Sequence, residues 1–342
     1  MQAVTFQAPG EVRLEDKPEP QLSAPTDAIV RVAATGVCGS DLHIYHGRVP
    51  VAPGFTLGHE YVGTIVAVGE AVARIAPGDR VVGSFTTACG TCFFCRRALA
   101  HKCDRTRTFG HGATLGDLPG TQAELALVPY ADLTLRRVPE GLTDAVALFA
   151  GDVAATGYHA AAAVRPGDTV AVLGLGPVGL MAVQSARVAG AAHVVAVDAV
   201  PERLALARRF GAEPVHLTEE DPRAHVKAVT EGRGVDVAVD AVGDPRALEL
   251  AVRLARKCGV VSVTGVYAER AEVHLGLVWI KALELRTGFA NVLAHLDQVL
   301  ALLATGRLDP APLVTHQLAL AQAPEAYGLY DRREALKIVL RP

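Results

Sequence analysis

Residues 169–190, TVAVLGLGPVGLMAVQSARVAG, give the clearest indication of the fold. Its continuous apolar run is typical of a strand buried on both faces of a parallel sheet. A glycine-rich turn follows at once, and the residues after it carry apolar side chains at helical spacing up to Gly190. Residues 169–186 carry no charge and could suggest a membrane helix, but their central glycines and proline favour a strand, a turn and a helix.

The turn has the spacing of a dinucleotide-binding loop. Gly174 permits the tight turn, Gly176 lets the backbone approach a pyrophosphate, and Gly179 lets the helix pack closely on the strand. The start of the helix supplies N–H groups and the positive end of a dipole for phosphate. A glycine pattern alone also fits a plain tight turn, so the prediction needs a second feature.

Asp198 provides that feature. It ends the next apolar run, HVVAVD (193–198), about 20 residues downstream, where a carboxylate accepts the ribose hydroxyls and repels a 2′-phosphate. We therefore predict NAD in preference to NADP. Arg203 either borders the adenine ribose or is a solvated helix residue. The predicted cofactor-binding residues are Gly174, Gly176, Pro177, Val178, Gly179, Asp198 and Arg203.

Strand and helix patterns alternate through the rest of this region, which predicts βαβ units and a doubly wound parallel sheet over residues 151–289. The patterns after Asp198 are PERLALARRFG (201–211), VDVAVDAVG (235–243), PRALELAVRLARKCG (245–259) and VVSVTG (260–265).

Residues 1–150 instead show short alternating runs with many turns, typical of an irregular, mostly β domain. HLDQVLALLATG (295–306) predicts a helix, and KIVLRP (337–342) predicts a strand that pairs back onto the first domain.

Composition limits the classes of function. The 342 residues fit two domains, and a net charge of −3 gives no basic surface for nucleic acid. The N-terminus lacks the layout of a signal peptide, so we expect a soluble cytoplasmic protein that neither binds nor spans a membrane. Six cysteines in such a chain argue for metal or redox chemistry and against a disulfide framework.

Four of the cysteines predict a structural zinc site in a lobe at about residues 89–103. Four thiolates with tight turns between them can close a tetrahedral zinc shell and leave no open position. An iron–sulfur cluster is the rival, but the short last gap followed by proline that is typical of bacterial ferredoxins is absent. The predicted ligands are Cys89, Cys92, Cys95 and Cys103.

A second metal site is suggested by Cys38, His59 and Asp152. One thiolate, one imidazole and one carboxylate give three protein ligands and leave a fourth position open, as in catalytic zinc sites. Each residue alone also fits an ordinary role: Cys38 a core thiol, His59 a hydrogen-bonded histidine, Asp152 a helix cap. Their presence beside a nicotinamide-binding fold favours zinc. Cys258, before Gly259, is expected in the core or at the end of a helix.

These motifs together resemble the zinc-containing medium-chain alcohol dehydrogenases over essentially the whole chain. The matching stretches are GVCGSDLH (36–43), LGHE (57–60), the four-cysteine lobe, GLGPVG (174–179) and KIVLRP (337–342). The resemblance implies a GroES-like catalytic domain, residues 1–150 and 290–342, and a Rossmann domain, residues 151–289. It also implies a homo-oligomer, expected to be a tetramer, with two zinc ions per chain and NAD.

The resemblance assigns further roles near the catalytic zinc. Cys38, His59 and Asp152 match the ligands, although many relatives have cysteine or glutamate in place of the aspartate. Glu60 matches an acid that lies beside the zinc and can exchange in as a ligand, and Asp41 matches the acid that orients the zinc histidine.

The implied reaction is hydride transfer between a zinc-bound alkoxide and the nicotinamide ring. Ser40 would pass the proton to the cofactor ribose and on to His43, whose ordinary pKa, about 6.5, suits an exit base; a plain loop histidine is the alternative. His46 is expected at the surface, and Phe85 either lines the substrate pocket or packs in the core.

Two other classes of function compete with this one. A zinc-free quinone or enoyl reductase of the same superfamily would lack both cysteine sets. A non-catalytic, zinc-stabilised nucleotide-binding protein would not need Ser40 and His43 beside an open metal site. The candidate substrates are primary or secondary alcohols, polyols, an amino-acid hydroxyl, and formaldehyde or a hydroxymethyl adduct. Phe109, His111 and Trp279 are candidate residues of the substrate pocket.

Overall fold

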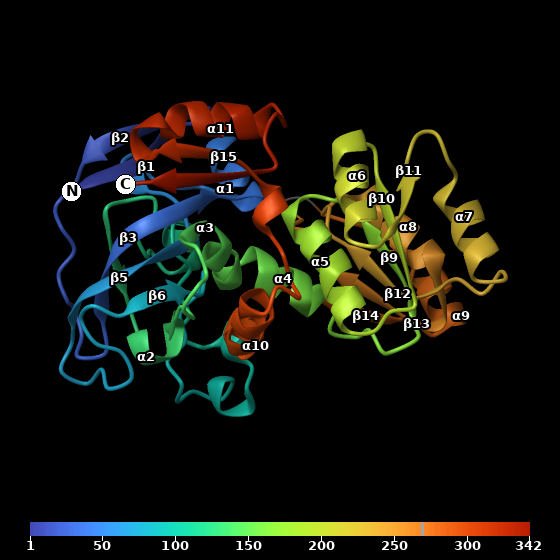
Figure 1. The fold of residues 1–342 in the computed structure, drawn as a ribbon, viewed down its shortest axis with the longest axis horizontal. Helices are drawn as coiled ribbons and strands as arrows, with labels where there is room; N and C mark the ends of the chain where they lie inside the picture. Colours follow the sequence, from blue (N-terminus) through green and yellow to red (C-terminus); the bar gives the residue numbers. More distant parts are fainter. Residues whose placement is uncertain (268–269) are drawn as a thin grey trace. The chain divides into compact units, whose positions relative to one another are not determined.

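The computed structural model describes residues 1–267 and 270–342. Its contacts divide the chain into two compact units (Figure 1). One comprises Met1–Ala155 and Asn291–Pro342, and the other comprises Thr156–Ala290.

The second unit contains a six-stranded parallel sheet in the order β11-β10-β9-β12-β13-β14. The strands are β9 (Thr169–Leu173), β10 (His193–Asp198), β11 (Glu213–His216), β12 (Val235–Asp240), β13 (Ala255–Val263) and β14 (Glu284–Thr287). This is the doubly wound, Rossmann-type order. The strands after β9 are added toward one edge of the sheet, and those from β12 onward are added toward the other edge. The predicted fold class is confirmed for this part of the chain.

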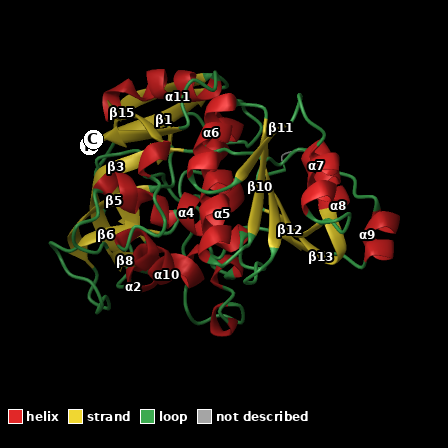
Figure 2. Cartoon of the chain, turned by 45° about the vertical axis from the view of Figure 1, so that its right-hand side comes forward, coloured by secondary structure: helices red, strands yellow, loops and turns green. Residues whose placement is uncertain are grey.

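Helices cover both faces of this sheet (Figure 2). Those on one face are α5 (Pro177–Val188) and α6 (Pro201–Arg209), and those on the other are α7 (Pro222–Val229), α8 (Pro245–Leu254) and α9 (Leu275–Lys281). The first four helices begin with proline, whose fixed φ and missing N–H suit the first helical position. Asp221 and Asp244 cap α7 and α8 by accepting backbone N–H groups of Arg223 and Arg246.

The expected position of Cys258 is wrong. Helix α8 ends at Leu254, and Cys258 lies in β13, where it is exposed and has φ +55°. The pairing of β12 with β13 shifts register between Val235 and Val237, so the extra residues of β13 form a bulge there. The polar residues of this bulge come immediately after α8. In the sequence they therefore look like one more turn of that helix.

The first unit is mostly β structure. Its strands are β1 (Gln2–Ala8), β2 (Glu11–Asp16), β3 (Ala28–Val37), β4 (Phe55–Thr56), β5 (Tyr61–Val68), β6 (Arg80–Gly83), β7 (Leu125–Val128), β8 (Leu135–Arg137), β15 (Val314–Ala319) and β16 (Lys337–Arg341). One sheet has the order β15-β16-β3-β5-β6-β8, with β7 also paired to β3, and a smaller sheet has the order β2-β1-β4.

Short helices connect these strands. The α-helices are α1 (Gly39–Tyr45), α2 (Ala131–Thr134), α3 (Asp144–Ala147), α10 (Val292–Ala304) and α11 (Ala323–Asp331), and α4 (Val153–Ala160) begins in this unit. The 3-10 helices are η1 (Cys95–Arg97), η2 (Ala100–Lys102), η3 (Ala113–Leu115), η4 (Leu148–Gly151), η5 (Ala311–Leu313) and η6 (Leu320–Gln322).

The C-terminal strand pairs with the strand that leads to Cys38. In the antiparallel pair of β16 and β3, Ile338 lies opposite Val37 and Val339 opposite Gly36. This confirms the prediction that the last residues pair back onto the first domain. The C-terminal segment therefore lies directly beside the first predicted zinc ligand.

The uncharged stretch of residues 169–186 forms β9, the glycine turn and most of α5. Among the described residues, no helix combines the length and the apolar character that a membrane crossing requires.

Candidate active site

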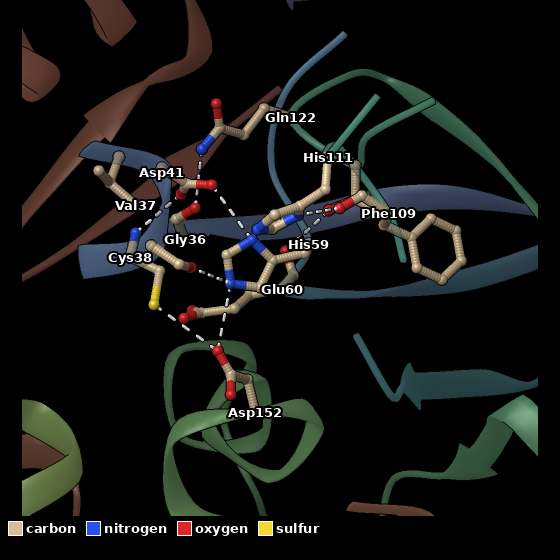
Figure 3. A network of polar contacts seen from close by, with 12 residues as sticks. Gly36, Val37, Cys38, Asp41, His59, Glu60, Phe109, His111, Gln122 and Asp152 are labelled. Carbon is tan, nitrogen blue, oxygen red and sulfur yellow. Dashed lines mark hydrogen bonds and ion pairs between the residues drawn. The ribbon is translucent and has the colours of Figure 1, made fainter. Parts of the chain in front are cut away.

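Three elements of the first unit position the expected zinc ligands. Cys38 follows β3 and caps α1, His59 lies in the turn between β4 and β5, and Asp152 lies between η4 and α4. In the turn before His59, Gly58 has φ +88°, a conformation that favours glycine. The three side chains point toward one another (Figure 3).

The distances between these side chains suit a zinc ion. The Asp152 carboxylate oxygen Oδ2 lies 3.2 Å from His59 Nε2 and 3.6 Å from Cys38 Sγ. Two ligand atoms bound to a tetrahedral zinc at its usual bond lengths lie about 3.3–3.7 Å apart. The donor set, one thiolate, one imidazole and one carboxylate, is also one that zinc prefers. The residues therefore fit the metal that the sequence predicts.

Asp41 fixes the orientation of His59. Its carboxylate accepts a hydrogen bond from His59 Nδ1 at 3.1 Å and one from the backbone N–H of Cys38 at 2.9 Å (Figure 3). With Nδ1 occupied, the lone pair of Nε2 is directed to the metal position. One buried acid thus aligns two of the three ligands.

The charges around His59 favour a cation. Burial disfavours the charged imidazole, but Asp41 and Asp152 raise the pKa of His59 well above its usual value. Burial, reinforced by Asp152, raises the pKa of the Cys38 thiol. A cluster of buried acids that holds a proton on histidine also attracts a divalent ion at the same place.

Glu60 lies beside the three ligands and is paired with a buried lysine. One donor atom from each of Cys38, His59, Glu60 and Asp152 can be chosen so that all four lie within 4.8 Å of one another. Lys337, at the start of β16, donates to Glu60 Oε1 at 2.5 Å, and both side chains are fully buried. Glu60 therefore has a cationic partner of its own.

Ser40 and His43 lie three residues apart on α1, so their side chains share one side of the helix. Ser40 Oγ is 3.3 Å from His59 Nε2, which brings the hydroxyl to the metal position. His43 is half-buried, and its Nδ1 has no hydrogen-bond partner among the described residues. His46 instead pairs with Asp331 at 2.8 Å on the surface, as expected.

The four cysteines of the lobe form a second donor group. Their sulfur atoms also lie within 4.8 Å of one another, and Cys92 Sγ is 3.9 Å from Cys103 Sγ. Backbone N–H groups of Cys89, Cys95 and Arg105 donate to sulfur. Burial opposes ionisation of Cys89, but hydrogen bonds from Thr91 and Cys92 lower its pKa to about 6. These bonds favour the thiolate form of Cys89, which is the form that binds a metal.

The glycine turn of the second unit has the conformation that the sequence predicts. Gly174 has φ +83°, Gly176 caps α5, and Pro177 is the first helical residue, followed by Val178. A Cβ on Gly179 would overlap the carbonyl oxygen of Gly174, so only glycine lets α5 pack this closely on the turn.

The Asp198 carboxylate lies against this turn. Oδ2 accepts the backbone N–H of Leu175 at 2.6 Å, and Oδ1 accepts those of Ala199 and Val200 at 2.7 and 2.9 Å. Arg203 Nη1, on α6, is 3.8 Å from Oδ2. The structure therefore brings Asp198 and Arg203 together beside the glycine turn.

The aromatic and histidine candidates for the substrate pocket separate into different places. The Phe85 and His111 rings lie 6.2 and 5.2 Å from the His59 ring, between centroids. Phe109 is buried in the core against Tyr61, and Trp279 is 81% exposed on α9 of the second unit. Phe85 and His111 remain beside the candidate site.

The sequence did not point to three buried polar residues behind the site: Gln122, Tyr327 and Lys337. Gln122 donates to the carbonyl oxygen of Gly36 at 2.9 Å and accepts from the Tyr327 hydroxyl at 2.9 Å. Lys337 donates to the carbonyl oxygen of Val37 at 3.2 Å. The one available signal was a lysine that opens the apolar strand KIVLRP, since a cation there needs an acidic partner.

Two family profiles match the chain. Residues 24–140 match the alcohol dehydrogenase GroES-like domain, and residues 177–305 match the zinc-binding dehydrogenase family. An uncharacterized zinc-type alcohol dehydrogenase-like protein of Bacillus subtilis, AdhB, is 35% identical over the full length of both chains. The chain belongs to the zinc-containing medium-chain alcohol dehydrogenase family.

Solved structures agree with this assignment. Alcohol dehydrogenase TADH from Thermus sp. ATN1 is 46% identical, with a TM-score of 0.96, and the match covers 100% of this chain and 99% of that one. A candidate zinc-binding dehydrogenase from Sinorhizobium meliloti, bound to NADP, is 29% identical with a TM-score of 0.88, covering 100% and 99%. As a zinc-dependent alcohol dehydrogenase-like protein, the chain has two donor groups suited to metal.

Proposed function

We propose that the protein transfers a hydride between a small alcohol and NAD, and in reverse between the reduced cofactor and an aldehyde or ketone. The unit of residues 1–155 and 291–342, which includes Asp152, carries the chemistry, and the unit of residues 156–290 binds the cofactor. The observation that carries the proposal is the group formed by the partly buried Cys38 and the buried His59 and Asp152, which offers three zinc ligands of different types. Structural zinc sites have four protein ligands, whereas a site with three protein ligands leaves the fourth position for water or substrate.

The chain's own residues prepare the chemistry at that site. A zinc ion held by Cys38, His59 and Asp152 would act as a Lewis acid toward the substrate oxygen. Asp41 holds the His59 ring in place, and Ser40 lies where it can accept the hydroxyl proton of the alcohol. The nucleotide-binding turn is supported as the cofactor site by its glycine geometry and by its place at the start of α5, where Gly176 makes no side-chain cap.

The experiment that tests the proposal combines metal analysis with an assay. The purified protein should contain two zinc ions per chain and reduce NAD in the presence of some members of a panel of primary alcohols, secondary alcohols and polyols. Formation of the reduced cofactor is followed by its absorbance. Two zinc ions with no turnover of any alcohol, aldehyde or ketone in either direction would contradict the proposed reaction.

A proton leaves the site through Ser40 and His43 in this proposal. Burial, reinforced by Arg48 and His46, lowers the pKa of His43, so the imidazole is neutral at pH 7 and can accept a proton. Replacing His43 by glutamine should lower kcat about tenfold or more at pH 7. The deficit should shrink as pH rises, because hydroxide then removes the proton. The pH profile of kcat checks this.

His46→Gln is the matched control for His43→Gln. His46 is on the same segment but pairs with Asp331 at the surface, so its replacement should leave kcat at pH 7 and the shape of the pH profile unchanged, and the loss of its charge near His43 should at most move the profile slightly to higher pH. If His43→Gln also keeps the profile of the unaltered enzyme, His43 is not the exit base.

The choice of NAD depends on Asp198. Asp198→Asn keeps the shape of the side chain and one acceptor oxygen but removes the charge that repels a 2′-phosphate. We expect the ratio of kcat/KM for NAD to that for NADP to fall by about 10- to 100-fold. The ratio is measured with one alcohol and both cofactors.

Asp221→Asn provides the control for Asp198→Asn. Asp221 is another aspartate that accepts a backbone N–H, but it caps α7 and lies outside the glycine turn. Its replacement should not move the ratio. An unchanged ratio in Asp198→Asn would remove the proposed role of this carboxylate.

A further inference from the structure

The buried pair of Lys337 and Glu60 connects the C-terminal strand to the candidate zinc site. Both side chains have no exposed surface. The Lys337 ammonium contacts both oxygens of the Glu60 carboxylate and donates to the carbonyl oxygen of Val37 at 3.2 Å. The ammonium thus makes two hydrogen bonds, one to Glu60 Oε1 and one to the Val37 carbonyl, and an ion pair with Glu60 Oε2. Two charges so deeply buried are tolerated because each is compensated by the other.

Glu60 is also close enough to the other acids to become a metal ligand. Its carboxylate belongs to the same donor group as Cys38, His59 and Asp152. If all four ligated one zinc ion, the shell would be closed and no substrate oxygen could bind. The ligands would then carry three negative charges against the two positive charges of the ion.

We propose that Lys337 is a positioning residue that holds the Glu60 carboxylate outside the zinc shell and so keeps the fourth coordination position free for substrate. The inference rests on the proposed catalytic zinc at Cys38, His59 and Asp152. Lys337 acts through Glu60, because the carboxylate that it contacts belongs to Glu60 and its other hydrogen bond goes to a backbone carbonyl.

The backbone around the pair is shaped to admit it. A Cβ on Gly36 would overlap Glu60 Oε2 and lie 3.1 Å from Lys337 Nζ. Gly36 is therefore the residue whose lack of a side chain leaves room for the carboxylate and ammonium behind Cys38. The Gly36 carbonyl oxygen accepts a hydrogen bond from Gln122 Nε2, and Gln122 Oε1 accepts one from the Tyr327 hydroxyl. This second contact gives a control that does not touch Glu60.

Cobalt substitution tests the proposal directly. With cobalt in both sites, the visible spectrum reports the coordination of each ion, and imidazole can bind only where a position is open. The closed four-cysteine site should not respond. We expect Lys337→Met to weaken imidazole binding to the other site by about tenfold or more, because the freed carboxylate competes for the open position. Tyr327→Phe should stay within about threefold of the unaltered protein.

A Glu60→Gln background separates positioning from general packing. A neutral amide has no charge for Lys337 to hold away, so adding Lys337→Met to Glu60→Gln should change imidazole affinity by less than about threefold. Lys337→Met that binds imidazole as tightly as the unaltered protein overturns the proposal. A loss of affinity that persists in the Glu60→Gln background overturns it as well.

The double variant also covers the case in which Lys337→Met does not fold. Lys337→Met with Glu60→Gln buries no unpaired charge, so it should fold, hold two metal ions and bind imidazole at least as well as the unaltered protein. Binding weakened about tenfold in this variant overturns the inference. Fewer than two metal ions in the unaltered protein would instead contradict the proposed function.

Discussion

Replacing Cys38 by serine is expected to remove one of two zinc ions per chain and to lower kcat/KM by about a thousandfold or more, since a Lewis-acidic metal contributes several kcal/mol to the barrier. Serine has nearly the same shape but is a much weaker zinc ligand than a thiolate. Asp152→Asn should have an effect in the same direction, because it removes a ligand charge while keeping the size of the side chain. Zinc content and initial rates with NAD are the measurements.

Cys258→Ser is the matched control for Cys38→Ser. Cys258 is an exposed thiol on β13, in the second unit, and belongs to neither donor group. Its replacement should leave two zinc ions and the full rate. Normal turnover and two zinc ions in Cys38→Ser would show that the thiol is not a ligand and that another residue completes the site.

The βαβ region was predictable because its strands differ so clearly from its helices. β9, β10 and β12 are apolar runs whose side chains are mostly buried between two layers of helices. The strands that the sequence did not indicate are the edges, β11 and β14. All four residues of β14 are exposed. β11 contains a proline, and only one of its four residues is buried. Neither strand therefore has the pattern of a core strand.

The metal donors could be named from the sequence because each carries its own chemical signal. The cysteine spacing of the lobe and the LGHE stretch are local patterns, and the structure brings their side chains into two groups. The signal for Lys337 is weaker, because a lysine in an apolar strand implies an acidic partner without indicating which residue it is. Its partner Glu60 lies 277 residues away, and only the pairing of β16 with β3 brings the two together. Contacts of this range depend on the complete topology, which local patterns do not determine.

Replacing Cys103 by serine is expected to unfold the four-cysteine lobe while leaving the catalytic donors in place. The hydrophobic cluster of the lobe consists largely of its own cysteines, joined by Ala88, Ala100, Tyr130 and Leu293. A structural zinc ion contributes on the order of 10 kcal/mol to small zinc-dependent folds, far more than so small an apolar cluster provides. The lobe should therefore become sensitive to proteolysis, and the melting temperature should fall by about 5–10 °C.

Asn291→Ala distinguishes loss of metal from loss of docking in this test. Asn291 Nδ2 donates to the carbonyl oxygen of Ala98 at 2.7 Å and so ties the lobe to the start of α10. Its replacement should keep two zinc ions and most of the protection, whereas Cys103→Ser should keep one. Turnover of Cys103→Ser measured well below its melting temperature should persist, because Cys38, His59 and Asp152 are intact. If that variant instead retains both zinc ions and an intact lobe, three cysteines suffice and the fourth is not needed to close the shell.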